Sequence, residues 1–422
     1  MNRPDIRRLP KRADPYQAQD ALLKLVSQKT LKTEKIPLEE CLGRVLSKDA
    51  FSNLNIPSYD KTFIDGYAIN NEETKTANPA KPTAFEITGK LFPVDYPTII
   101  EVHKGEAIYV ACGAPIPKGA TATVKVEETR LHESTVEVFR EIHTGEGIIP
   151  LGDDLRKGQL ILRKGHTLRP QDLGVLASLK MTCAEVYKKP LVSIISGGDE
   201  LLKQCQTNPA AIANNYALVV AGLTSELGAA PKQMGIMPDA IEKVTEMIAN
   251  ALENSDFIIT IGGSSVGIKD FVPDAVNALG KPGVVTQGVL LRPGAISGFG
   301  IVNGKPVIML PGHIGSCIAG FYLFAAPLIG AFSGSNAAVL PKINAKISED
   351  VKNGPQFRFL LVHLKRENGK FLAQPTEGGS SALTTIVNSN GYAMIPPHTE
   401  LKKNSDVDVF LFNKLEMTEI LP

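Results

Sequence analysis

Apolar runs of strand length alternate with segments of helical spacing between residues 188 and 332. The strand-like runs are LVSIIS, KQMGIM, DFIITI and PVIML, and the helical segments are 215–227, 240–252, 272–279 and about 315–330. Continuous apolar strands that alternate with helices are typical of a parallel sheet buried on both faces. The pattern therefore predicts a doubly wound α/β domain over residues 188–332.

Two further regions carry short β-like runs and lack a helical period. The first contains AFEITG, AIYVA, TATVKV and TVEVF between Pro and Gly turns, and the second, after the linker SGSNAAVLP, contains KINAKI, FRFLLVHL, YAMIPP and VDVFLF. Such runs between turn residues indicate strands. We predict an inserted β domain over residues 51–149 and a small C-terminal β-barrel or sandwich over residues 333–422.

Three short helices are predicted outside these regions. Asp14 and Pro15 fit the N-cap and first position of a helix, and Leu22 belongs to its apolar stripe. A second helix is expected after Pro37, through PLEECLGRVL, and a third over 171–179. We therefore predict an N-terminal helical and linker domain made of residues 1–50 and 150–187.

The charge balance changes what kind of partner is expected. The chain has 422 residues, of which 45 are basic and 44 acidic, so its formal net charge is +1. A balance this even gives no long-range field toward nucleic acid or an anionic membrane. We expect neither partner, and any site for an anion must be local.

Cysteine usage and hydropathy favour a cytoplasmic protein. The five cysteines are scattered, with no CxxC pair and no zinc spacing among Cys and His residues. The N-terminal stretch MNRPDIRRLPKR lacks the apolar core of a signal peptide, and no unbroken run of about 18 apolar residues occurs. We expect reduced thiols, a cytoplasmic location and no membrane span.

Three glycine-bearing loops follow three of the predicted α/β strands. They are ISGGDEL (Ile195–Leu201), IGGSSVGIKD (Ile261–Asp270) and LPGHIGS (Leu310–Ser316). Ligands of open α/β sheets bind beyond the carboxyl ends of the strands. We therefore expect the three loops to meet at one edge of the sheet.

The loop IGGSSVG has the composition of an anion-binding turn. Glycines let backbone N–H groups approach a phosphate closely, and a following helix adds a favourable dipole. A helix that opens with Gly315 and Ser316 would also present free N–H donors. Plain turns remain the alternative for both loops, and Asp270 could equally serve as a helix N-cap.

Carboxylates on the same rim raise an electrostatic question. Asp199 and Glu200 follow the first strand, next to a loop suited to an anion. Carboxylates would repel an anionic ligand unless a divalent cation lies between them. The sequence therefore predicts a Mg²⁺ ion at this edge.

Several segments in order along the chain resemble the MoeA/gephyrin family. They are SYDKTFIDGYAI (Ser58–Ile69), GAPIPKGA (Gly113–Ala120), the stretch from GDDLRKGQLIL to SIISGGDEL, IGGSSVGIKDF and IMLPGHIGS. The matching order and spacing run from Ala18 to about Val409. The resemblance implies a helical N-terminal region, an inserted β domain, a MogA-like doubly wound α/β domain and a C-terminal β-barrel.

The resemblance also implies an activity. Family members insert molybdenum into molybdopterin, with molybdate and an adenylated pterin as substrates, Mg²⁺ as the divalent cation and AMP as the released product. A homodimer is implied, together with a molybdopterin adenylyltransferase as a partner. The residues alone do not choose between molybdate and tungstate.

Site residues carried over from the resemblance fall into three groups. The catalytic group is Asp65, Asp154, Glu200 and Asp270, and the metal group is Asp239, Asp270 and Glu200. The group that would bind the pterin phosphate and nucleotide is Gly262, Gly263, Ser264, Ser265, Gly267, Arg292, Pro311, Gly312, His313 and Ser316. Local structure offers an alternative for three of the acids: a turn at Asp65, a polar turn at Asp154 and a helix N-cap at Asp239.

The chain departs from the family pattern mainly where the family carries cations. Gly288 and Ala295 stand at lysine positions, Ile296 at a proline position, and His313 and Ile314 replace Asn-Pro. Each lost cation at a desolvated anion contact costs about 1.5–3 kcal/mol. Three hypotheses follow: a molybdenum or tungsten transferase, a non-catalytic relative that binds pterin or nucleotide, and an enzyme that adenylylates molybdopterin.

Overall fold

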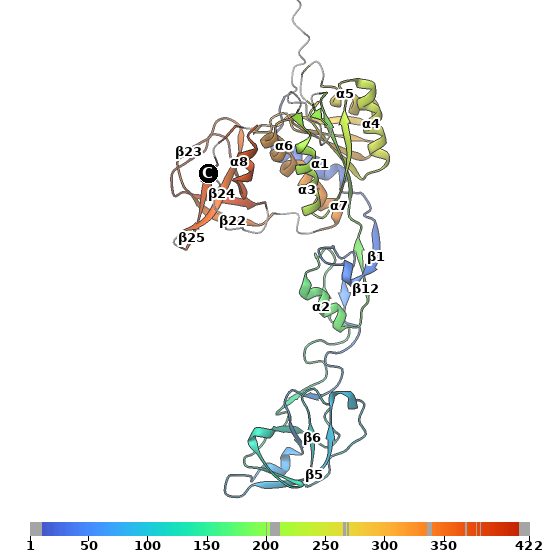
Figure 1. Ribbon diagram of the computed structural model, residues 1–422, viewed down its shortest axis with the longest axis vertical. Coiled ribbons are helices and arrows are strands. Elements are labelled where there is room, and N and C mark those ends of the chain that lie inside the picture. The colour runs from blue at the N-terminus through green and yellow to red at the C-terminus, as the bar shows by residue number, and fades with distance from the viewer. Residues whose placement is uncertain are drawn as a thin grey trace, which may run out of the picture. The chain divides into compact units, whose positions relative to one another are not determined.

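In the computed structural model, the chain forms two compact units (Figure 1). Unit 1 comprises Met1–Ser47, Gly165–Pro170 and Cys183–Pro422, and unit 2 comprises Lys48–Lys164 and Gln171–Thr182. The structure describes residues 11–199, 201–202, 212–264, 267, 270–335, 340–367, 369–376, 378–379 and 381–412.

A six-stranded sheet forms the centre of the α/β part of unit 1. Its order is β16 (Ala230–Met237), β13 (Leu191–Gly197), β17 (Phe257–Ile261), β21 (Lys305–Leu310), β20 (Gly298–Val302) and β18 (Pro282–Gln287). The first four strands are parallel, as predicted, whereas β20 and β18 are antiparallel to their neighbours. The tight connection from β20 to β21, with Asn303 and Gly304 at positive φ, can join only antiparallel strands.

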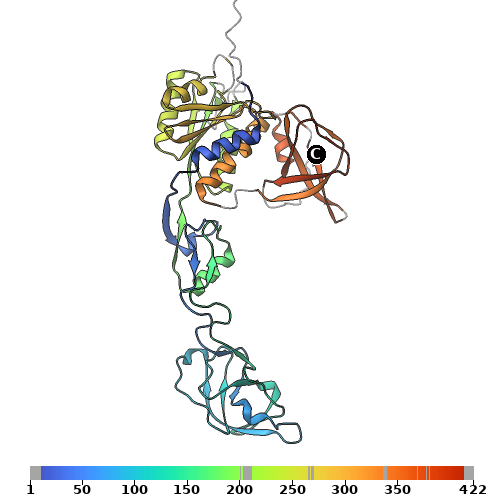
Figure 2. The ribbon, with the colours of Figure 1, turned by 180° about the vertical axis from the view of Figure 1, so that it is seen from behind.

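Helices cover both faces of this sheet, which confirms the doubly wound arrangement (Figure 1 and Figure 2). One face carries α4 (Ile241–Glu253) and α5 (Val272–Leu279), whose cluster includes Ile195 of β13. The opposite cluster includes Ile194, and its helices are α1 (Pro15–Val26), α3 (Asn215–Glu226), α6 (Ile314–Gly320) and α7 (Ala326–Ser333). Neighbouring residues of a strand point to opposite faces, so β13 contributes to both cores.

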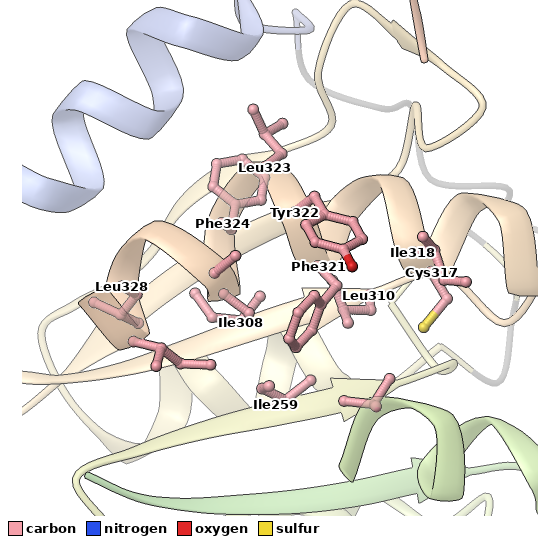
Figure 3. Packing of buried hydrophobic residues seen from close by; sticks show 14 of the residues in the cluster. Ile259, Ile308, Leu310, Cys317, Ile318, Phe321, Tyr322, Leu323, Phe324 and Leu328 are labelled. Carbon is pink, nitrogen blue, oxygen red and sulfur yellow. The ribbon is translucent and has the colours of Figure 1, made fainter. Parts of the chain in front are cut away.

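A long apolar helix lies inside this domain. It runs from α6 through a π-helical turn, η5 (Phe321–Ala325), into α7. By length and composition Ile314–Ser333 could cross a membrane, but 83% of its apolar window is buried within the protein. Figure 3 shows Phe321 and Leu328 packed over Ile308 and Ile259 of the sheet. Its apolar character is therefore that of a core helix.

The C-terminal part of unit 1 is a closed β-barrel. The sequence predicted either a barrel or a sandwich here, and the barrel is confirmed. The ring of pairings passes through β24 (Phe357–Glu367), β25 (Lys370–Pro375), β22 (Lys342–Ile347), β28 (Asp406–Leu411) and β26 (Gly391–Ile395), and β26 pairs again with β24. The short strand β19 (Leu291–Arg292), which precedes β20 in the chain, pairs with β24 from outside this ring.

Unit 2 contains the inserted β structure that the sequence predicted. Its six-stranded sheet has the order β7 (Ala122–Lys125), β4 (Gly66–Ile69), β6 (Glu106–Val110), β5 (Thr83–Leu91), β9 (Thr135–Val138) and β8 (Thr129–His132). Unit 2 also contains two separate two-stranded antiparallel sheets. One is formed by β2 (Ala50–Phe51) and β11 (Leu160–Leu162), and the other by β3 (Lys61–Thr62) and β10 (Ile148–Ile149).

The predicted helix after Pro37 is wrong. Only one 3-10 turn, η1 (Leu38–Glu40), forms there, because Gly43 takes a φ of 72° and donates its N–H to the Leu168 carbonyl oxygen. A right-handed helix cannot continue through that conformation.

A separate helical N-terminal region is not shown by the structure. Helix α1 packs in the helical layer of the α/β sheet. Much of the remaining segment is extended, since β1 (Thr33–Pro37) pairs with β12 (Cys183–Tyr187). The third predicted helix is present as α2 (Pro170–Ser178).

Candidate ligand-binding site

The three glycine-bearing loops converge at the carboxyl edge of the parallel strands, as the sequence predicted. They line a cleft of about 650 Å³, which we call the glycine cleft. Gly197 and Gly198 come from the end of β13, Gly262 and Gly263 from the end of β17, and Gly312 from the end of β21.

Glycine is required at the start of the second loop because the backbone is crowded and takes positive φ. Gly262 and Gly263 have φ values of 82° and 66°, and a Cβ on Gly262 would lie 3.0 Å from the Gly197 carbonyl oxygen. The Gly262 N–H donates to the Leu310 carbonyl oxygen at 2.9 Å, and the buried Ser264 hydroxyl donates to the same oxygen at 3.3 Å. Ser264 therefore fixes the loop to β21.

Asp270 lines the glycine cleft and closes the same loop. Its Oδ2 accepts a hydrogen bond from the Gly267 N–H at 2.6 Å, and its own N–H donates to the Gly267 carbonyl oxygen at 3.1 Å. The N-cap of α5 is Phe271, so the predicted alternative of Asp270 as an N-cap is wrong. One carboxylate oxygen is engaged by the loop, and among the described residues none is hydrogen-bonded to the other oxygen.

Asp239 is the second described carboxylate on this cleft. Its backbone N–H donates to Asp199 Oδ1 at 3.1 Å. The N-cap of α4 is Ala240, so the N-cap alternative for Asp239 is also wrong. Glu200 and Ser265 lie outside the described residues. Across the described part of the chain, no group of three His, Cys, Asp or Glu side chains could hold a metal ion by itself.

Asp65 and Asp154 belong to unit 2, and both are exposed there. Asp65 Oδ1 accepts a hydrogen bond from the Cys112 N–H at 2.9 Å, so its carboxylate contacts a distant loop. The Asp154 N–H donates to the Ile56 carbonyl oxygen at 3.0 Å. A Cβ on Gly66 would lie 2.0 Å from the Val124 carbonyl oxygen, which explains the glycine of the IDGYA segment.

A second cleft of about 560 Å³ adjoins the first. His313 and Ile296 line both clefts. We call it the basic cleft because Arg292, on β19, and Arg358, on β24, line it together. No described carboxylate forms an ion pair with either guanidinium within 4.0 Å. Burial and the neighbouring Arg292 lower the pKa of Arg358, although an arginine remains charged at neutral pH.

The remaining predicted site residues divide between the two clefts. Gly312 lines the glycine cleft, whereas Pro311 and Ser316 line the basic cleft. His313 is the exposed N-cap residue of α6, and its side chain makes no capping hydrogen bond. Its imidazole is thus placed at the border of the two clefts.

Sequence reasoning did not find Arg358. The run FRFLLVHL indicates a barrel strand, and only the cross-strand register places its arginine beside Arg292. Another cationic side chain, Arg12, lies near Gly288, which stands at a lysine position of the family. The Cγ of Arg12 is 3.4 Å from where a Cβ on Gly288 would lie. Gly288 itself has a φ of 93°, so a lysine would be strained there.

Family models match three consecutive parts of the chain. "MoeA N-terminal region (domain I and II)" matches residues 14–179, "Probable molybdopterin binding domain" matches residues 193–331, and "MoeA C-terminal region (domain IV)" matches residues 344–412. The second match contains the loops of the glycine cleft, and the third contains the barrel wall of the basic cleft.

Relatives match along nearly the whole chain. A protein of Bacillus subtilis (strain 168) named "Molybdopterin molybdenumtransferase" is 31% identical over 381 residues, which are 88% of this chain and 88% of that protein. A protein of the same name from Staphylococcus epidermidis is 29% identical and covers 94% of this chain and 96% of its own. The crystal structure of a molybdopterin biosynthesis MoeA protein from Pyrococcus horikosii has a TM-score of 0.85 at 28% identity and covers 96% of this chain and 100% of its own. The chain therefore belongs to the MoeA family, and its homologues are molybdopterin molybdenumtransferases of molybdenum cofactor biosynthesis.

Proposed function

We propose that this chain inserts molybdate, or tungstate, into adenylated molybdopterin and releases AMP. The observation that carries the proposal is that the glycine cleft and the basic cleft adjoin and share His313 and Ile296. A phosphate-bearing substrate and a metal oxyanion could therefore be held next to each other.

The glycine cleft suits the phosphate and nucleotide part of the substrate. Its glycines allow close backbone approach, and at the carboxyl edge of a parallel sheet N–H groups can face a bound phosphate. We assign Gly262, Gly263, Gly267 and Gly312 to this role. Ser264 holds the loop in place, because its hydroxyl donates a hydrogen bond to a carbonyl oxygen of β21. Ser265 stays a prediction from the sequence.

The basic cleft suits the oxyanion. Two guanidinium groups, neither in an ion pair with a described carboxylate, present planar donor sets to one small space, and such groups bind tetrahedral oxyanions through paired hydrogen bonds. We assign Arg292 and Arg358 to molybdate, with Pro311, His313 and Ser316 shaping the cleft. Arg358 adds positive charge to a cleft in which Ala295 stands where the resemblance implies a lysine.

The carboxylates of the glycine cleft fit a Mg²⁺ ion. Mg²⁺ in phosphate sites is usually held by one or two carboxylates together with substrate phosphates and water. Asp239 and Asp270 supply that number from the described residues, and Glu200 is the third predicted ligand. The ion would neutralise charge on the departing AMP phosphate. Asp270 would also keep the loop closed through Gly267.

Further residues and protein partners belong to the proposed reaction. Asp65 and Asp154 would act in catalysis, and a homodimer and a molybdopterin adenylyltransferase would be the protein partners. We place the reaction in the cytoplasm, which the four free cysteines among the described residues support. The chain would have four functional domains: residues 1–50 together with 150–187, residues 51–149, residues 188–332 and residues 333–422.

A turnover assay tests the proposal. Purified chain is mixed with adenylated molybdopterin, molybdate and Mg²⁺, and both AMP release and metal-loaded pterin are measured. We expect turnover in the parent chain and its loss in Arg358→Gln and Asp270→Asn. A parent chain that binds the adenylated pterin without releasing AMP would instead be a non-catalytic relative, and equal turnover in all three proteins would reject this assignment of the clefts.

A further inference from the structure

A third pocket, of about 450 Å³, opens at the opposite edge of the α/β sheet. Leu191, the first residue of β13, lines this pocket, and Gly197, the last residue of the same strand, lines the glycine cleft. Six steps of about 3.3 Å separate them, so the two sites lie roughly 20 Å apart along the strand. The third pocket is therefore distinct from the site described above.

Lysines surround this pocket. They come from three segments: Lys29 and Lys32 follow α1, Lys188 and Lys189 precede β13, and Lys305 begins β21. Among the described residues of the lining, the carboxylates are those of Glu253 and Asp256, so the described lining carries a surplus of three positive charges. The whole chain has a net charge of +1. We call this feature the lysine pocket.

Structural roles explain only two of these lysines. Lys305 Nζ donates to the Leu252 carbonyl oxygen near the end of α4. Lys29 Nζ donates to the Asp256 carbonyl oxygen at 3.5 Å, pairs with its carboxylate at 3.7 Å, and lies 4.1 Å from the ring centroid of Phe332. Lys305 thus offsets the partial negative charge near the carboxyl end of α4, and Lys29 offsets the carboxylate charge of Asp256.

The other three lysines have no such partner. Lys32, Lys188 and Lys189 are exposed, and no described residue forms an ion pair with any of them. Burial is the main cause that lowers the pKa of Lys29, the attraction of Asp256 opposes it, and the repulsion of Lys305 and Lys32 lowers it further. The cluster thus contains repulsion that a bound anion would relieve.

We propose that the lysine pocket binds a small polyphosphate anion. Ammonium groups bind phosphate oxygens as point charges, and a volume of 450 Å³ lies within the range of small-molecule sites. A chain of linked phosphates offers more charged oxygens to the three lysine-bearing segments than a single phosphate does. Asp256 keeps its bonds to Lys29 and to the Leu191 N–H, at 2.9 Å, and so does not compete for the other lysines.

Calorimetry with inorganic tripolyphosphate tests this assignment. The background is the Arg358→Gln variant of the full chain, in which the basic cleft has lost one of its two arginines. In that background Lys188→Gln/Lys189→Gln neutralises two exposed, unpaired lysines of the pocket. Lys232→Gln/Lys281→Gln is the matched control, because both lysines are exposed on the same domain and lie outside the pocket.

With AMP added in excess to occupy the glycine cleft, we expect one saturable site in the background variant. Its affinity should fall about tenfold or more in Lys188→Gln/Lys189→Gln and change less than about twofold in the control. Lys29 should also become less reactive toward an amine acylating reagent when tripolyphosphate is present. Inorganic phosphate should bind more weakly than tripolyphosphate, because it meets fewer lysines.

Three results would overturn the proposal: no saturable binding, an equal loss of affinity in the control, or unchanged reactivity of Lys29. Equal thermal midpoints of all variants without anion exclude misfolding as the cause of a loss. The transferase assay is independent of this measurement, so failure of one proposal is distinguishable from failure of the other.

Discussion

Arg292 of β19 lies directly opposite Arg358 of β24, in a parallel pair that extends the barrel sheet. Like charges in opposed positions of neighbouring strands destabilise a sheet by up to about 1 kcal/mol. Arg358 is half-buried, and although the charge of Glu349 opposes the repulsion, no described carboxylate lies within ion-pair distance of either arginine. An arrangement that costs stability and presents two cations to a cleft is typical of an anion site.

Replacing Arg358 should therefore increase the stability of the fold and weaken the binding of molybdate. We expect Arg358→Leu to raise the free energy of unfolding by about 0.2–1 kcal/mol, since a like-charge pair is removed. Molybdate affinity should fall by about 10–100-fold, which corresponds to about 1.5–3 kcal/mol for a lost charged hydrogen bond. Arg366→Leu, an exposed change on the same strand, should leave molybdate affinity unchanged. Calorimetry with molybdate and thermal unfolding measure both quantities.

Asp270 should be needed for Mg²⁺ more than for folding. Asp270→Asn keeps an oxygen that accepts from the Gly267 N–H but removes the charge. We expect Mg²⁺ affinity in the presence of AMP to fall about 10–100-fold, with little change in thermal stability. Glu242→Gln, at the start of α4, is the matched control. Unchanged Mg²⁺ affinity in Asp270→Asn would remove Asp270 from the metal site.

Two glycines should respond to alanine in opposite directions. Gly262→Ala should destabilise unit 1 by about 1–3 kcal/mol, because φ is positive and the new Cβ meets the Gly197 carbonyl oxygen. Gly222→Ala lies within α3 and meets nothing within 4 Å, so it should stabilise by about 0.4–1 kcal/mol. Denaturant unfolding of both variants decides, and destabilisation of equal size would contradict the strain argument.

Acid should weaken a charge network of unit 2. Arg140 contacts both Glu128 and Glu146, and its hydrogen bond lowers the pKa of Glu146. A depressed carboxyl pKa gives stability that is present above the unfolded-state pKa and lost as pH falls through the folded-state pKa. Arg140→Gln should cost about 1 kcal/mol or less at pH 7 and nothing below the folded-state pKa of Glu146. Thermal unfolding across that pH range measures the difference, and a cost independent of pH would exclude the network as its source.

Periodicity predicted most of the α/β elements well. Helix α5 covers Val272–Leu279, as expected, and β13, β17 and β21 lie where apolar runs indicated strands. The antiparallel strands β20 and β18 were not predicted because SGFGIV and PGVVTQ are short and rich in glycine or polar residues. The expected helix after Pro37 failed because a long-range hydrogen bond of Gly43 with Leu168 decides that segment.

The candidate site was predictable only in part. Strand ends followed by glycines located the glycine cleft, because parallel strands place their carboxyl ends together. Arg358 could not be found, since its position depends on the pairing of β19 with β24, a contact between residues about 66 positions apart in register. The Asp65 carboxylate likewise contacts Cys112, 47 positions away, where a local turn was the alternative.

Strand β19 has a consequence for how unit 1 comes apart. It pairs with the barrel strand β24, the Phe357 N–H donates to the Leu290 carbonyl oxygen at 2.9 Å, and both segments lie outside the linker 333–341. Separating the barrel would break backbone hydrogen bonds and expose the aromatic rings of Tyr322 and Phe359, which stack across the same junction. The two folds should therefore melt in a single cooperative transition, and a barrel expressed alone should expose the edge of β24 that β19 covers in the intact chain.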